Sequence, residues 1–278
     1  MKYIYLAFLM LTSILSFSQV QFEPSLTEAF KKAKQQNKPV FIKYYNSDCS
    51  VCNRLGDLLN QDAEISAYYN SNFINYAMNA FNELSDADHA LLIHANLHFN
   101  SVPVLLYFDK DKNFLHHSSG DISSEAIMNE AKKSTHSRFN TSGLKSKFDA
   151  GDRTVRTLYA YCQMLIINKD EQKLKKVSQD LFESFNTSEL PTKKSYLVLK
   201  RVVKTTDNGF FQYWINNLDK LKGFENSINK DTEISQLKSI VLTELSRPDV
   251  KEWSAAKKNE FKGYITKLKI SDDPNIFF

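Results

Sequence analysis

Two cysteines separated by two residues, Cys49 and Cys52, lie where a strand-like pattern gives way to a helical one. The apolar segment 39–45 precedes the pair and predicts a strand, and leucines at helical spacing follow it. A thiol at a helix N-terminus faces unpaired backbone N–H groups and the positive end of the helix dipole. Both favour the thiolate, which is the form that attacks disulfides. The junction therefore indicates a reactive cysteine pair.

A cysteine pair can also be half of a metal site or two packing residues. A zinc site would need about two further soft ligands, and the sequence has no second C-x-x-C pair. His94 and His98 have a spacing that can ligate zinc, but no third ligand is recognisable, so we expect no metal site. The third cysteine, Cys162, lies in an apolar helical stretch and is expected to pack in a core.

Further along the chain, Pro103 opens the apolar segment 103–108 directly after Val102. Together with the cysteine pair, this segment resembles the thioredoxin family, and the likeness extends over roughly residues 22–138. It implies a cis proline beside the cysteines and a Val102 backbone that offers itself to an extended client peptide. It also implies an α/β thioredoxin fold, in which a central mixed sheet is flanked by helices.

Three positions depart from the usual thioredoxin pattern. Lys43 stands where relatives carry a buried acid, Asp48 where they carry tryptophan, and Ser50-Val51 where they carry Gly-Pro. Asp48 is a candidate cap for the cysteine helix, yet its charge would disfavour a neighbouring thiolate, whereas the Lys43 ammonium would favour one. Lys43 and Asp48 are therefore candidate tuners of thiol acidity, and the direction of disulfide exchange stays open.

The first eighteen residues have the composition of a secretory signal peptide. Lys2 is followed by an apolar run over 4–15 and by small residues at Ser16 and Ser18. A membrane anchor is the alternative, but the run is shorter than the ~20 residues that span a bilayer. We expect a soluble, secreted protein, with the periplasm as the favoured compartment, where disulfides form and persist.

We divide the remainder into a thioredoxin-like domain, residues 19–138, and an all-α helical domain, residues 139–278. Serine, threonine, asparagine and glycine cluster around the boundary, and the apolar residues beyond it have helical spacing. We expect five or six helices, forming a small bundle or a repeat-like array. The aromatic residues of one predicted helix are expected in its core: Phe210, Phe211, Tyr213 and Trp214.

These features predict an enzyme, a thiol-disulfide oxidoreductase that exchanges disulfides with secreted or periplasmic client proteins. Cys49 would attack, Cys52 would resolve the mixed disulfide, and no metal or small-molecule cofactor would be needed. A redox partner is expected, for which a membrane-bound protein is one option, and the helical domain would bind a partner or self-associate. The formal charge of +4 shows no basic stripe, which disfavours nucleic-acid binding. The alternative is a non-catalytic thioredoxin-fold peptide-binding or scaffolding protein.

Overall fold

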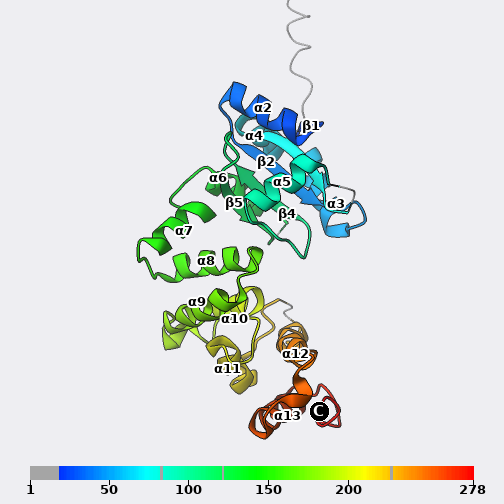
Figure 1. Cartoon of the computed structure of the whole chain (residues 1–278), viewed down its shortest axis with the longest axis vertical. Coiled ribbons are helices and arrows are strands. Elements are labelled where there is room, and N and C mark those ends of the chain that lie inside the picture. Colours follow the sequence, from blue (N-terminus) through cyan, green and yellow to red (C-terminus); the bar gives the residue numbers. More distant parts are fainter. Residues whose placement is uncertain (1–18, 82–83, 121, 226–227) are drawn as a thin grey trace, which may run out of the picture. The chain divides into compact units, whose positions relative to one another are not determined.

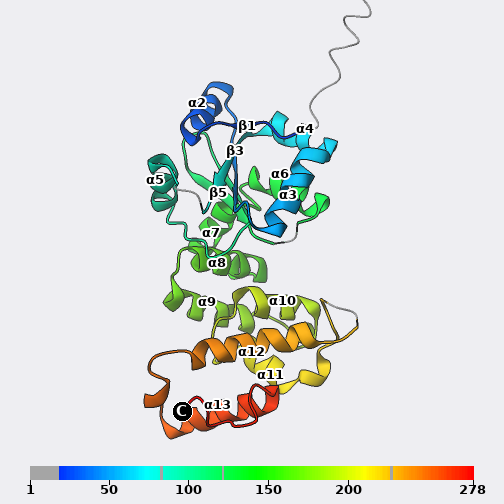
Figure 2. The same ribbon diagram turned by 90° about the vertical axis from the view of Figure 1, so that its right-hand side faces the viewer.

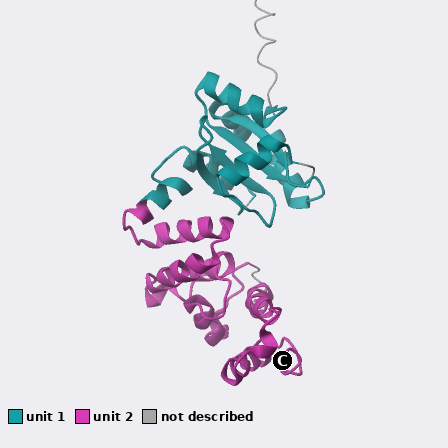
Figure 3. Ribbon diagram, viewed as in Figure 1, with its two compact units in different colours: residues 1–146 teal, residues 147–278 magenta. Residues whose placement is uncertain are grey.

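The computed structural model describes residues 19–81, 84–120, 122–225 and 228–278. The predicted signal peptide, residues 1–18, lies outside the described residues. The chain forms two compact units that divide between Ser146 and Lys147 (Figure 3). No helix among the described residues is long and apolar enough to cross a membrane.

The first unit is built on one five-stranded sheet with the order β1-β3-β2-β4-β5. Its strands are β1 (Phe22–Glu23), β2 (Val40–Tyr45), β3 (Ile74–Asn79), β4 (Val104–Phe108) and β5 (Phe114–Ser118). Strands β1 and β2 run parallel to β3, whereas β4 is antiparallel to both β2 and β5. The predicted mixed sheet is confirmed. The two-residue edge strand β1 was not predicted.

Helices cover both faces of this sheet (Figures 1 and 2). They are α2 (Leu26–Gln36), α3 (Ser50–Gln61), α4 (Ala63–Asn72), α5 (Asp86–His94) and α6 (Ser124–Ser134), followed by α7 (Thr141–Asp149). Side-chain caps fix the starts of several of them. Ser25 accepts from the Glu28 N–H at 3.2 Å, and Ser123 caps α6 in the same way. Helices α3, α4 and α6 lie on one face of the sheet, and α2 and α5 on the other.

The larger core lies between the sheet and helices α3, α4 and α6. Alternation along β2 turns Phe41 toward this side, where its ring lies 4.7 Å from Tyr69 and 5.3 Å from Tyr107. The two tyrosine hydroxyls hydrogen bond to each other at 2.8 Å, so their polar ends are satisfied inside the core. Leu55 and Leu59 of α3 are fully buried in the same cluster. This packing fixes α3 against the sheet.

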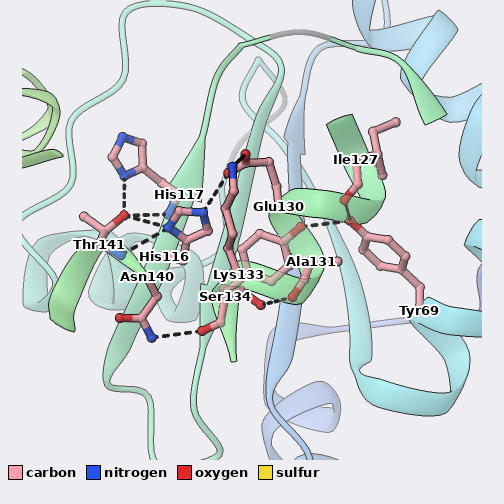
Figure 4. A network of polar contacts seen from close by, with 11 residues as sticks. Tyr69, His116, His117, Ile127, Glu130, Ala131, Lys133, Ser134, Asn140 and Thr141 are labelled. Carbon is pink, nitrogen blue, oxygen red and sulfur yellow. Dashed lines mark hydrogen bonds and ion pairs between the residues drawn. The ribbon is translucent and has the colours of Figure 1, made fainter. Parts of the chain in front are cut away.

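A buried polar network joins β5, α6 and the start of α7 (Figure 4). The His116 ring lies 2.8 Å from Glu130 Oε2 through Nε2 and 2.8 Å from Thr141 Oγ1 through Nδ1. The Thr141 backbone N–H also donates to Nδ1 at 3.2 Å, so in the neutral ring the proton lies on Nε2 and faces the Glu130 carboxylate. Lys133 donates to the other oxygen of that carboxylate.

This network explains why the units divide later than predicted. The segment after residue 138 is not a linker, because Thr141 is bound to the sheet and the side chain of Asn140 accepts from the Gly143 N–H at 2.8 Å. A Cβ on Gly143 would lie 1.6 Å from the Ser137 carbonyl oxygen, so only glycine fits there. The first part of α7 therefore belongs to the sheet unit.

The second unit is helical throughout its described residues, as predicted. Its α-helices are α8 (Val155–Ile167), α9 (Glu171–Glu183), α10 (Lys193–Val202), α11 (Gly209–Asn216), α12 (Asp231–Leu245) and α13 (Ala255–Leu268). Phe210, Phe211 and Trp214 are fully buried, whereas Tyr213 is half-buried. The Trp214 indole N–H donates to Ser195 Oγ at 3.1 Å. Cys162 is fully buried in α8, and burial raises the pKa of its thiol to about 12.

The folded state should lose stability as the pH falls below the ordinary pKa of histidine, because His117 is buried as a neutral ring. Burial, followed by the nearby His116, lowers the pKa of His117 from 6.5 to about 3. Between these values only the unfolded chain binds the proton, so this residue should remove up to about 1.4 kcal/mol of unfolding free energy per pH unit.

Denaturant unfolding of wild type and His117→Asn between pH 7 and pH 5 measures this contribution. The variant should show a shallower loss of unfolding free energy with falling pH. The same substitution at the exposed His94 controls for loss of an imidazole elsewhere in the unit. Equal slopes in wild type and His117→Asn would contradict the assignment.

Candidate functional site

The cysteine pair occupies the first turn of α3, directly after the loop that leaves β2. Cys49 is the N-cap residue, with extended backbone angles, and its sulfur accepts a hydrogen bond from the Cys52 backbone N–H at 3.2 Å. The interpretation of Asp48 as the cap was therefore wrong. Asp48 lies one residue too early, and its backbone N–H donates to Asn46 Oδ1 at 3.0 Å in the preceding loop.

The two thiols differ in exposure. Cys52 is 1% exposed, whereas Cys49 is partly exposed, and both are free thiols. The difference follows from the helix geometry. Cys52 lies on the face of α3 that carries the buried Leu55 and Leu59, whereas Cys49 stands at the end of the helix.

The pKa values of the two thiols are shifted in opposite directions. The hydrogen bond from the Cys52 thiol to the Cys49 sulfur lowers the pKa of Cys49 most, and the backbone N–H groups of Cys52 and Val51 lower it further. Burial raises the pKa of Cys52, although the Asn46 backbone N–H and the Lys43 charge act against this rise. The arrangement thus favours an accessible thiolate at Cys49 over a protonated, buried thiol at Cys52.

Val102 and Pro103 lie beside the cysteines, although they are distant in sequence. The antiparallel pairing of Tyr44 with Val104 brings the start of β4 to the end of β2 that leads into Cys49. The Cys49 sulfur lies 3.9 Å from the Val102 carbonyl oxygen, and the Val102–Pro103 peptide bond is cis. Pro103 is buried and has no backbone N–H. The backbone groups beside the Cys49 sulfur are therefore those of Val102.

Lys43 and Asp48 lie in different environments. Asp48 is exposed in the loop. Lys43 is half-buried on the α3 side of β2, and burial lowers the pKa of its ammonium. Its Nζ lies 4.3 Å from the Tyr45 ring centroid and 5.7 Å from that of Phe22. Of the two candidate tuning residues, Lys43 is the one whose charge lowers the pKa of a cysteine, Cys52.

Two features of the site were missed at the level of sequence. Asn46 has two roles. Its side chain accepts a hydrogen bond within the loop, and its backbone N–H lowers the pKa of Cys52. An asparagine at the start of a strand-to-helix loop is a typical turn residue and could have been considered. Val51, between the cysteines, is 40% exposed and adds an apolar surface beside Cys49.

No group of three or more His, Cys, Asp or Glu side chains that could hold a metal ion occurs in the part of the chain that the structure describes. Helix α5 ends at His94, so His98 lies beyond it. His98 Nε2 is 3.2 Å from Asn96 Oδ1.

Comparison with known proteins agrees with this architecture. A family model described as a thioredoxin-like domain matches residues 26–134. Among solved structures, the chain is similar to a DsbH oxidoreductase, with 19% identity, 42% of this chain and 84% of that chain covered, and a TM-score of 0.36. It is also similar to a proposed disulphide isomerase from Bacteroides thetaiotaomicron, with 22% identity, 42% and 94% coverage, and a TM-score of 0.36. No curated protein matches the sequence. The described fold and the matched family model identify residues 26–134 as a thioredoxin-like domain.

Proposed function

We propose that this protein is a thiol-disulfide oxidoreductase that exchanges disulfides with secreted or periplasmic client proteins through Cys49 and Cys52. The observation that carries the proposal is the asymmetry of the pair at the start of α3. A partly exposed sulfur accepts a backbone hydrogen bond, and a buried thiol lies one helical turn away. A pair that only packed in a core would need neither the exposure of Cys49 nor its hydrogen bond.

The exchange would proceed in two successive thiol-disulfide exchange steps. The Cys49 thiolate attacks one sulfur of a client disulfide, a Cys49–client bond forms, and the other client sulfur leaves as a thiolate that takes up a proton. Cys52 then loses its proton and attacks the Cys49 sulfur. This second step closes the Cys49–Cys52 disulfide, oxidises the pair by two electrons and releases the client as a thiol. The reverse sequence would introduce a disulfide into a reduced client.

The client backbone would lie along Val102. Its carbonyl oxygen lies beside the Cys49 sulfur, and an extended peptide can pair with the backbone of such a segment. The exposed side chain of Val51, which lies between the two cysteines in the sequence, would contact an apolar client residue. Turnover requires a redox partner to restore the pair, and this reaction needs no metal or nucleotide cofactor.

Removing either cysteine should stop turnover at a different step. Cys49→Ser should reduce a model protein disulfide no faster than buffer, because the attacking sulfur is gone. Cys52→Ala should attack once and accumulate mixed disulfides, which non-reducing gels and mass spectrometry detect. Cys162→Ala is the matched control and should keep its activity, since Cys162 is fully buried in the other unit. Turnover by Cys49→Ser would contradict the proposal.

The pH dependence of alkylation should separate the two thiols. Because the hydrogen bond from the Cys52 thiol is the main cause that lowers the pKa of Cys49, iodoacetamide should modify Cys49 with a midpoint below the ~8.5 of a free cysteine. Cys52 should stay unmodified in the folded protein. In Cys52→Ala the midpoint for Cys49 should move upward, toward the value of a free cysteine. Mass spectrometry after timed quenching measures both, and a midpoint that does not move would contradict the role of Cys52.

A further inference from the structure

Lys43 is a half-buried lysine that no carboxylate neutralises among the described residues. Alternation along β2 puts it on the same face as Phe41, which packs against α3. Its lateral neighbours in the sheet are the apolar side chains of Ala77 and Leu105. The salt bridges formed by described residues do not include Lys43. Its ammonium group instead lies over the Tyr45 and Phe22 rings.

The Lys43 ammonium group lies next to Gly56, a position of α3 that carries no side chain. A Cβ built on Gly56 would lie 3.6 Å from Lys43 Nζ, so the amine occupies the space that a longer side chain at this position would fill. Glycine within a helix is destabilising relative to alanine, and Gly56 has no left-handed backbone that would require it. Gly56 is four residues after Cys52 and therefore on the same helix face. Lys43 thus lies under the face of α3 that carries the resolving cysteine.

The charged and titratable groups near Lys43 indicate which residue its ammonium group acts on. The Cys52 thiolate would be the anion on this face of α3, and the Lys43 charge lowers the pKa of Cys52. Tyr45 is the titratable group on β2, whereas β3 and β4 contribute Ala77 and Leu105 and β1 contributes the Phe22 ring. The unneutralised ammonium is therefore available to Cys52.

We infer that Lys43 is a positioning residue that stabilises the Cys52 thiolate and so speeds the release of a client from its mixed disulfide with Cys49. The inference rests on the proposed exchange function and assigns the second of its two steps. The Cys52 thiol gives its proton to solvent and its thiolate attacks the Cys49 sulfur. The Cys49–client bond breaks, and the client thiolate takes up a proton. Lys43 stays protonated throughout and holds the negative charge in place before the attack.

A two-phase reaction of the reduced full-length protein with the aromatic disulfide 5,5′-dithiobis(2-nitrobenzoate) tests this assignment. Attack by Cys49 releases the first coloured thiolate, and attack by Cys52 on the resulting mixed disulfide releases the second. Lys43→Met should leave the first phase largely unchanged and slow the second. Without the Lys43 charge the pKa of Cys52 rises and its thiolate population falls, while the higher nucleophilicity of the remaining thiolate offsets part of this loss. The net slowing at pH 7 should therefore be about three- to tenfold.

Three comparisons separate a charge effect from a packing defect. Lys43→Arg keeps the charge and should retain most of the second-phase rate. Lys38→Met removes a half-buried lysine at the other end of β2 and should leave both phases as in wild type. Above the Cys52 pKa the deficit of Lys43→Met should disappear, because the thiolate is then fully formed in both proteins.

Two results would overturn the inference. One is a second phase of wild-type rate in Lys43→Met and Lys43→Gln at pH 7. The other is a deficit that persists at every pH and is shared by Lys43→Arg, which would show a packing role. Absence of the first phase in the wild-type protein would instead overturn the proposed function itself, so the two failures are distinguishable.

Discussion

The hydrogen bond from the Cys52 backbone N–H to the Cys49 sulfur is the contact on which the site depends. It makes the thiol of Cys49 the cap of α3, so the helix start and the position of the sulfur are fixed together. The rest of the helix supports this contact, because Leu55 and Leu59 hold α3 on the sheet through the cluster around Phe41. A displacement of the helix would move both cysteines and take the Cys49 sulfur away from Val102.

The register of the sheet supplies the second half of the site. Pairing of β2 with β4 sets Val102 and Pro103 beside Cys49, and the same β2 strand places Lys43 beneath the helix face of Cys52. Each cysteine thus has its own neighbour. Cys49 has a backbone carbonyl and partial exposure, whereas Cys52 is buried on the face of α3 that covers the Lys43 ammonium group. This division suits a pair in which one sulfur meets the client and the other acts only from inside.

Much of the sheet unit could be predicted from the sequence because its signals are local. The Ser25 cap, the strand patterns and the cysteine spacing are each visible within a few residues. The cap of α3 was assigned to Asp48 instead of Cys49, since the usual preference for aspartate ignores that a cysteine sulfur can accept the same hydrogen bond. Helix α7 was missed because its polar, glycine-containing start resembles a linker, and Thr141 is held by His116 from a distant strand. The relation of Lys43 to Gly56 requires the three-dimensional structure, because neither residue alone indicates the other.

The central claim is that Cys49 and Cys52 form a reversible redox couple. The most direct measurement is the reduction potential of the pair, determined by thiol alkylation after equilibration in dithiol buffers of stepped potential. The account predicts a single two-electron transition that involves Cys49 and Cys52 and leaves Cys162 reduced. A value near the roughly −270 mV of thioredoxin would indicate a reductant, and one near the roughly −120 mV of DsbA an oxidant. The absence of a reversible transition in the folded protein would contradict the account and leave a binding or scaffolding role for the thioredoxin-like domain.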